Sequence, residues 1–527
     1  MKDFCIVIPA IKKNAIIPDQ LIKKLDGITL IQRAINTSLE IRDSSDILIV
    51  TDSEEILLIA ERNNIDYHYD KTLKFNSTNI LTKLNPILKR KVDIYKNMIL
   101  YRANAPLIKS EKILKGYEKF LTNDSYILTT VEYKNKEIYE DDNGSFVFKT
   151  KNFYKEIKAF QILSFKTLLK KDYKFSPFIL NEEESIEIEK YQDWWICEKL
   201  LQRKRIVFNV IGSIEIGMGH IYHSLALAHE ITNHEIIFIC DKQYEIAVDK
   251  IAAMDYKVIA TNDVLTEIIS LKPDLLINDI LNTEAEFIKR IKQEDIKIVN
   301  FEDLGEGSKY TDLTINELYD TPQFKDDNYL WGYKYLFLRD EFNESKPHNF
   351  IEHISGALIT FGGTDQNNLT LIALKSIINI CQQFNIKIYL LCGKGYRYKS
   401  NLEKFVSKYN DVDIEIFYTT NTVTKIMEKT QVAISSNGRT IYELADMNIP
   451  SIIISHHKRE ATHTFATLEH GFINLGIFNK NTEQLIKKNF KKIAIDRIFR
   501  KLLYLNIKKF HFRDNKQKIV KKIMELL

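Results

Sequence analysis

The chain has 527 residues, enough for about three or four compact units, and its 45% hydrophobic and 28% charged residues are ordinary for a folded protein. Its 75 lysines and arginines are nearly balanced by 71 aspartates and glutamates, which argues against a nucleic-acid-binding protein. None of the five cysteines forms a CxxC pair, so neither a disulfide scaffold nor a structural zinc site is expected. No apolar run approaches the ~18 residues of a membrane span, and the first residues resemble a strand, not a signal peptide. We therefore expect a cytoplasmic protein without an integral membrane segment.

Short apolar runs alternate with longer amphipathic stretches along almost the whole chain. Strand-like runs include FCIVIPA (4–10) and DILIVTD (46–52). The same alternation continues in the second half with RIVFNVIG (205–212), GALITFGG (356–363) and PSIIISH (450–456). Buried parallel strands have this composition, and the intervening stretches are typical of crossover helices. The sequence therefore predicts an α/β fold.

Polar, irregular sequence suggests two boundaries, near residues 203 and 350. The predicted units are 1–203, 204–350 and 351–527. The last of them ends in a basic tail, because residues 481–527 hold 14 lysines and arginines against 4 aspartates and glutamates. We interpret the tail as the solvated face of closing helices. Weak contact with an anionic membrane surface or with nucleotide phosphates remains the alternative.

The loop after the first strand, within IPAIKKNAIIPDQLIKKLDGITLI (8–31), could wrap a nucleotide phosphate. Further segments are TDSEEI (51–56), YRANAPLI (101–108) and EIEKYQDWWICEKLL (187–201). Together they resemble the nonulosonic-acid cytidylyltransferases, which make CMP-sialic acid and its relatives from CTP. The resemblance spans residues 1–203 and implies a nucleotidyltransferase-like Rossmann-type domain. It also implies CTP, a nonulosonic acid and Mg²⁺ as partners if this domain is active.

This first domain departs from the family at its phosphate loop. The family's arginine falls on Ile11, its serine on Asn14 and its lysine on Ala15. Phosphoryl chemistry needs cationic groups or Mg²⁺, which these side chains do not supply. The residues that could compensate or still bind are Lys12, Lys13, Lys23 and Asp193. Three interpretations stay open: a catalytically silent domain, a transferase with altered chemistry, and a domain that only binds a partner or a sugar.

The second half holds three glycine-containing segments, each beside an apolar run. In NVIGSIEIGMGHIYHSLALA (209–228), Gly217 and Gly219 permit close backbone approach and His220 begins a helix. FGGTDQNNLT (361–370) offers bare N–H groups at Gly362, Gly363 and Thr364, which suit a pyrophosphate. SSNGRTIYEL (435–444) places further N–H donors before a helix. Glu443 lies one turn deeper in that helix, where it could accept hydrogen bonds from ribose hydroxyls.

These segments resemble the nucleotide-sugar enzymes of the glycosyltransferase-B fold. The most similar is the UDP-sugar hydrolase of pseudaminic acid biosynthesis, and the spore-coat polysaccharide proteins and lipid II-forming N-acetylglucosaminyltransferases share parts of the pattern. The match covers residues 204–527 and implies a two-lobed unit that binds a UDP-sugar between its lobes. It implies that His220 is the general base, that Glu443 binds ribose, and that Gly362, Gly363 and Thr364 lie across the cleft. The implied UDP phosphate loop is Ser436, Asn437, Gly438, Arg439 and Thr440.

Departures from this second family concern sugar contacts more than the nucleotide loop. The family's helix arginine falls on His223. Asp279, at the end of a strand, could contact sugar hydroxyls or cap a loop. A zinc site from His456, His457 and His463 lacks a fourth ligand, so no metal or cofactor is expected for this reaction.

The favoured function is hydrolysis of a UDP-2,4-diacetamido-2,4,6-trideoxyhexose. A glycosyltransferase using the same donor remains an alternative. Another is a CMP-nonulosonate cytidylyltransferase whose C-terminal half only binds or scaffolds.

Overall fold

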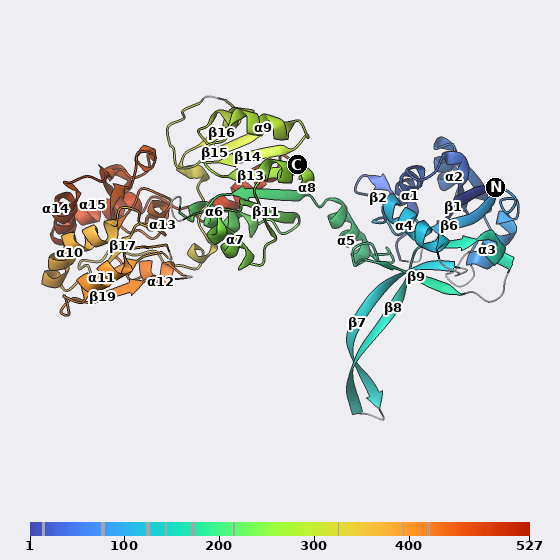
Figure 1. The fold of residues 1–527 in the computed structure, drawn as a ribbon, viewed down its shortest axis with the longest axis horizontal. Coiled ribbons are helices and arrows are strands. Elements are labelled where there is room, and N and C mark those ends of the chain that lie inside the picture. Colours follow the sequence, from blue (N-terminus) through green and yellow to red (C-terminus); the bar gives the residue numbers. More distant parts are fainter. Residues whose placement is uncertain are drawn as a thin grey trace. The chain divides into compact units, whose positions relative to one another are not determined.

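A computed structural model describes residues 1–12, 16–74, 80–122, 127–142, 145–169, 174–213, 217–324, 326–393, 395–418, 420 and 422–527. The chain divides into two compact units, Met1–Arg203 and Lys204–Leu527, which are considered separately (Figure 1). The predicted α/β class is confirmed, because both units are built on parallel strands joined by helices.

The N-terminal unit contains a mixed sheet with the strand order β5-β4-β1-β6-β8-β7-β9. Strands β5, β4, β1 and β6 are parallel, whereas β8 runs antiparallel to both β6 and β7. The strands of this sheet are β1 (Lys2–Ala10), β4 (Ile47–Thr51), β5 (Asp66–Tyr69), β6 (Tyr95–Tyr101), β7 (Ile127–Asp142), β8 (Ser145–Ser164) and β9 (Phe175–Leu180). The short pair β2 (Lys24–Leu25) and β3 (Ile28–Thr29) is separate, and the β7–β8 hairpin projects from the unit (Figure 1).

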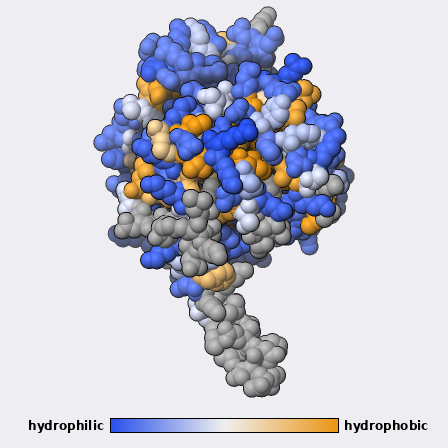
Figure 2. Space-filling model, turned by 90° about the vertical axis from the view of Figure 1, so that its right-hand side faces the viewer, coloured by the Kyte–Doolittle hydropathy of each residue, from blue (hydrophilic) through white to orange (hydrophobic). Residues whose placement is uncertain are grey.

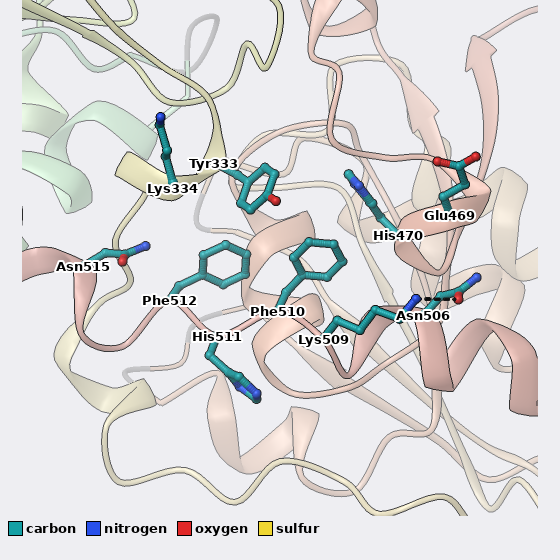
Figure 3. Close-up of a pocket in the computed structure, with 10 residues that line it drawn as sticks. All are labelled: Tyr333, Lys334, Glu469, His470, Asn506, Lys509, Phe510, His511, Phe512 and Asn515. Atoms are coloured by element: carbon teal, nitrogen blue, oxygen red, sulfur yellow. Dashed lines mark hydrogen bonds between the residues drawn. The ribbon is translucent and has the colours of Figure 1, made fainter.

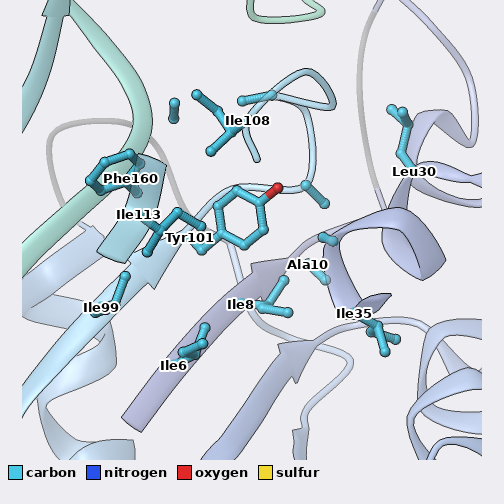
Figure 4. Packing of buried hydrophobic residues seen from close by; sticks show 14 of the residues in the cluster. Ile6, Ile8, Ala10, Leu30, Ile35, Ile99, Tyr101, Ile108, Ile113 and Phe160 are labelled. Carbon is cyan, nitrogen blue, oxygen red and sulfur yellow. The ribbon is translucent and has the colours of Figure 1, made fainter. Parts of the chain in front are cut away.

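The helices of this unit are α1 (Leu30–Leu39), α2 (Glu54–Arg62), α3 (Ile80–Leu88), α4 (Ser110–Leu121) and α5 (Tyr191–Leu201). Strand β1 is buried over most of its length because its apolar side chains pack on both faces of the sheet. Ile6 and Ile8 lie near Ile99 and Tyr101 of the neighbouring β6 in this core (Figure 4). On the face turned toward the viewer in Figure 2, hydrophobic side chains are interspersed with hydrophilic ones.

The C-terminal unit has two lobes, each with a parallel sheet. The first sheet has the order β12-β11-β10-β13-β14-β15-β16 and the second β19-β18-β17-β20-β21-β22. The first lobe contains β10 (Arg205–Val210), α6 (Gly219–Ala228), β11 (Glu235–Asp241), α7 (Glu245–Ala252), β12 (Val258–Thr261), α8 (Val264–Leu271), β13 (Leu275–Asp279), α9 (Ala285–Lys292), β14 (Lys297–Phe301), β15 (Leu313–Asn316) and β16 (Tyr329–Trp331). The second contains β17 (Gly356–Thr360), α10 (Leu369–Phe384), β18 (Lys387–Leu391), α11 (Lys399–Val406), β19 (Ile414–Phe417), α12 (Thr424–Met427), β20 (Val432–Ser435), α13 (Thr440–Asp446), β21 (Ser451–Ser455), β22 (Phe472–Ile477), α14 (Thr482–Ile495) and α15 (Arg497–Ile507).

The last helix, α16 (Asn515–Met524), departs from the predicted division of the chain. We predicted that residues 351–527 form one lobe, but Ile519 and Ile523 belong to the hydrophobic core of the first lobe. The Lys516 ammonium also lies 3.2 Å from Glu230 Oε1 of that lobe. The chain therefore crosses back to the first lobe at its end.

The five cysteines are buried free thiols, and burial raises the pKa of each to about 12. Among the described residues, no helix combines the length and the apolar character needed to cross a membrane.

Candidate active site

His220 lies in the first turn of α6 and makes a close contact with Asp279, the last residue of β13. Its Nδ1 donates to Asp279 Oδ1 at 2.6 Å. The other oxygen of Asp279 accepts from His223 Nδ1 at 2.7 Å and from Ser224 Oγ at 3.1 Å. Because Nδ1 is bonded to the carboxylate, Nε2 is the nitrogen of His220 that remains to accept a proton.

Asp279 is fully buried, and its carboxylate is surrounded by hydrogen-bond donors. Burial by itself would raise the pKa of Asp279, but the charges and hydrogen bonds of His220 and His223 outweigh it and hold the pKa well below its ordinary value. The group is therefore an anion that fixes the orientation of His220. The sequence left open whether Asp279 contacts sugar hydroxyls or caps a loop; in the structure its carboxylate has three protein partners, His220, His223 and Ser224.

Arg439 of the second lobe reaches a cluster of buried carboxylates in the first lobe. Its Nη2 lies 2.8 Å from Glu317 Oε1, 3.4 Å from Glu302 Oε2 and 4.0 Å from Asp279 Oδ1. Burial by itself would lower the pKa of Arg439, but the three carboxylates outweigh burial and raise the pKa. Burial by itself would raise the pKa of Glu302, but His463 and Arg439 outweigh burial and lower the pKa. Arg439 therefore neutralises these acids in this structure, and a diphosphate would compete with them for its guanidinium.

Glu443 of α13 makes an ion pair that the sequence did not predict. Its Oε1 accepts from Arg339 Nε at 3.0 Å and from Arg339 Nη2 at 2.7 Å. Burial raises the pKa of Glu443 and Arg339 opposes that rise. No described residue bonds to Oε2, so that oxygen remains available for a hydroxyl group.

Three glycines predicted at the nucleotide site have room beside their Cα atoms. Among the described residues, no atom lies within 4 Å of a Cβ added at Gly217, Gly362 or Gly363. Gly217 (φ 89°) and Gly362 (φ 74°) also adopt left-handed backbone conformations, which favour glycine. A Cβ on Gly393, by contrast, would lie 2.1 Å from Gly363 O, so Gly393 is needed for the close approach that supports this loop.

The side chains of Asn437 and His463 hold the loop before α13 in place. Asn437 Nδ2 donates to the carbonyls of Glu460 at 2.7 Å and His463 at 3.2 Å, and His463 Nδ1 donates to the Asn437 carbonyl at 2.6 Å. Gly219 and Gly438 both lie near this loop. A Cβ added to Gly219 would lie 3.9 Å from Arg439 Nη1, and a Cβ added to Gly438 would lie 3.9 Å from Ser436 Oγ. Thr440 is the first residue of α13, and Thr364 contacts the loop at Gly395.

Several buried polar atoms from both lobes lack a hydrogen-bond partner in the described part of the chain. Each is a strong donor or acceptor, and such atoms are usually satisfied by protein, water or ligand. They are His223 Nε2, Glu317 Oε2, Asn437 Oδ1, Arg439 Nε, Arg459 Nε and His463 Nε2. Three of them still lie near a carboxylate: His223 Nε2 is 3.7 Å from Glu317 Oε1, and Arg459 Nε and His463 Nε2 are 3.8 Å and 3.6 Å from Glu302 Oε1. These residues, with His220 and Asp279, define the interlobe site, whose composition fits a polar ligand.

The sequence analysis missed Glu317 of the interlobe site and Arg339, the partner of Glu443. Glu317 directly follows β15, and Arg339 precedes a short 3-10 turn at Asp340–Phe342. The available signal for Glu317 was its place at a strand's carboxyl end, where ligands of open α/β sheets bind. Among the described residues, no group of three or more His, Cys, Asp and Glu side chains is placed to hold a metal ion.

The predicted residues of the N-terminal unit have protein contacts or lie at its surface. The Lys12 ammonium lies 2.7 Å from Glu55 Oε1 and 3.5 Å from Asp19 Oδ1. Asp193 Oδ2 accepts from the backbone N–H groups of Glu189 and Lys190 at 3.0 Å, which caps α5. Lys23 is exposed, and Lys13 lies outside the described residues.

The fold is a unit built on one mixed sheet, followed by a unit of two lobes that each contain a parallel sheet, which is the architecture expected for a nucleotidyltransferase-like domain joined to a glycosyltransferase-B-like one. No protein-family model matches the chain. The uncharacterized protein MJ1062 of Methanocaldococcus jannaschii is 33% identical over 263 residues, which cover 46% of this chain and 54% of that protein. The chain thus spans about half the length of this relative.

Two further relatives carry descriptive names. The spore coat polysaccharide biosynthesis protein SpsG of Bacillus subtilis is 26% identical over 275 residues, covering 48% of this chain and 79% of SpsG. A Helicobacter pylori protein named pseudaminic acid cytidylyltransferase and UDP-2,4-diacetamido-2,4,6-trideoxy-beta-L-altropyranose hydrolase is 23% identical over 232 residues, covering 42% of this chain and 41% of that protein. These matches confirm the predicted resemblance to a fusion of a cytidylyltransferase-like domain with a domain like the UDP-sugar hydrolase and the spore-coat polysaccharide proteins.

Among solved structures, MurG of Acinetobacter baumannii aligns with a TM-score of 0.46 at 10% identity, over 61% of this chain and 99% of MurG. A CMP:2-keto-3-deoxy-manno-octonic acid synthetase aligns with a TM-score of 0.31 at 10% identity, over 38% of this chain and 99% of the synthetase.

Proposed function

We propose that the C-terminal unit hydrolyses a UDP-linked 2,4-diacetamido-2,4,6-trideoxyhexose to UDP and free sugar. The observation that carries this proposal is the buried Asp279–His220 pair at the start of α6, in a site that also holds unsatisfied polar groups of both lobes. The named substrate of the H. pylori relative supports the choice of sugar.

In the proposed reaction, His220 Nε2 takes a proton from water as the water oxygen attacks the anomeric carbon. The bond between that carbon and the UDP oxygen breaks, and its electron pair leaves with UDP. Asp279 stabilises the imidazolium that forms, as a buried carboxylate does for a catalytic histidine. The N-terminus of α6 and the open glycine backbone favour the diphosphate. No metal takes part in this scheme, so a chelator should leave the activity intact.

The direct test incubates the full-length protein with UDP-2,4-diacetamido-2,4,6-trideoxyhexoses and follows UDP and free sugar by NMR. Release of both without an acceptor is the expected result. Tight UDP binding without release would overturn hydrolysis and favour a glycosyltransferase that needs an acceptor.

The Gly363→Ala variant tests whether the 362–364 loop binds the diphosphate. The added methyl group meets no atom of the described residues within 4 Å, so we expect unchanged stability. It would occupy space proposed for phosphate, so calorimetric titration should show UDP binding weakened by about tenfold, or about 1.4 kcal/mol. Gly393→Ala is the matched comparison, because its methyl group clashes with the Gly363 carbonyl and should lower stability as well. Unchanged UDP affinity in Gly363→Ala would contradict this placement.

For the N-terminal unit we expect no CTP turnover. Ile11 occupies the position of the family's phosphate-loop arginine, and Lys12 is already paired with Glu55 and Asp19. Lys12 is therefore not free to stabilise the transferring phosphoryl group as the family's arginine would. The measurement is CMP-sugar formation from CTP, Mg²⁺ and a nonulosonic acid. Robust product formation would show an active cytidylyltransferase, and the hydrolase proposal would then describe only one of two activities.

A further inference from the structure

Helix α15 presents an apolar stripe at its surface. Ile498, Leu502 and Leu505 follow one another at helical spacing, and their exposed fractions are 84%, 49% and 49%. The neighbouring Ile495 and Leu468 are also exposed, and Leu468 lies beside the helix because its carbonyl accepts from Asn506 Nδ2 at 3.1 Å. The opposite face of α15 is buried through Leu503 and Ile507. The stripe is therefore not the side that holds the helix to its lobe.

Exposed basic residues are frequent on α14 and α15, and one of them, Arg497, forms an ion pair with Glu352. The exposed basic residues of α14 and α15, and of the turn that follows, are Lys487, Lys488, Lys491, Lys492, Arg497, Lys501, Lys508 and Lys509. The two acidic residues within 481–509 are Glu483 and Asp496, and Asp496 caps α15 by accepting from the Phe499 N–H at 2.9 Å. A row of apolar side chains bordered by lysines is the pattern of a helix that lies in a membrane interface.

An open cavity of about 680 Å³ lies at the C-terminal end of α15. Its lining includes the basic side chains of Lys334, His470, Lys509 and His511, with Glu469 as the acidic one. Figure 3 shows the rings of Tyr333, Phe510 and Phe512 beside them. The cavity thus adjoins the end of α15 and has two lysines, Lys334 and Lys509, in its lining.

We propose that the α14–α15 face docks on an anionic membrane surface, with the α15 stripe entering the interface and the lysines contacting lipid phosphates. Charge complementarity selects this occupant: a second copy of the chain would bring the same positive face, and like charges repel. The expected attachment is reversible, because a short stripe and a basic patch give weaker binding than an inserted helix.

The test is flotation of the full-length protein with vesicles of phosphatidylcholine alone or mixed with phosphatidylglycerol. We expect binding to the mixed vesicles that decreases with added salt, and little binding to the neutral ones. A triple variant, Ile498→Ser, Leu502→Ser and Leu505→Ser, should reduce the bound fraction by about tenfold. The reversal Lys501→Glu with Lys508→Glu and Lys509→Glu should abolish the preference for the anionic lipid.

The matched control changes three exposed leucines of the N-terminal unit, Leu58, Leu114 and Leu121, to serine and should bind like the unaltered protein. Circular dichroism establishes that each variant is folded. Equal binding to both kinds of vesicle, no binding, or undiminished binding by the triple variant would overturn the proposal. Loss of a dimer in the triple variant, seen by light scattering, would instead assign the stripe to a second copy.

Discussion

Replacing His220 by alanine should lower kcat for UDP-sugar cleavage by about 10²–10⁴-fold, the range typical for loss of a general base. The affinity for UDP should change little, because His220 is assigned to the proton transfer and not to nucleotide binding. NMR detection of UDP release gives the rate, and calorimetric titration with UDP gives the dissociation constant.

Two further variants separate chemistry from binding. Asp279→Asn keeps the size of the side chain but removes the charge that stabilises the imidazolium, so we expect a large loss of kcat with UDP still bound. Glu443→Ala should mainly weaken UDP binding, since the proposed contact of Glu443 is with ribose. If Glu443→Ala lost the chemistry and His220→Ala lost the binding, the assignment of roles would be wrong.

Removing the Arg439 guanidinium should destabilise the C-terminal unit strongly. In Arg439→Ala, the buried Glu317 would lose the guanidinium that lies 2.8 Å from its Oε1, whereas Glu302 would keep Arg459 and His463 beside it. Loss of one partner of a buried ion pair costs about 3–5 kcal/mol. Urea denaturation of the full-length protein measures the change in the free energy of unfolding. The exposed pair of Arg290 and Glu294 provides the control, because Arg290→Ala should cost about 0.5 kcal/mol or less.

A second substitution shows whether charge is the cause of the Arg439→Ala effect. Adding Glu317→Gln to Arg439→Ala removes the uncompensated charge and should restore part of the lost stability. Equal losses in Arg439→Ala and Arg290→Ala would show that the carboxylate cluster does not depend on Arg439.

The α/β fold and the position of His220 at a helix start could be predicted because they rest on local patterns, namely apolar runs and glycine spacing. The partner of His220 could not, because Asp279 is 59 residues away and approaches only once β13 pairs with β10. The pairs Arg439–Glu317 and Arg339–Glu443 join residues 122 and 104 positions apart, so they depend on how the lobes pack. The burial of Ile519 and Ile523 in α16 was not predicted, because the many lysines around them indicate an exposed helix.

The return of α16 to the first lobe means that the two lobes are joined by two passages of chain. One lies between β16 and β17 and the other between α15 and α16, where Asn515 Nδ2 donates to the Leu336 carbonyl at 2.8 Å. Two tethers allow rotation about a line through both of them but restrict twisting and separation. A rotation of one lobe about these two tethers would separate Arg439 from Glu302 and Glu317 together.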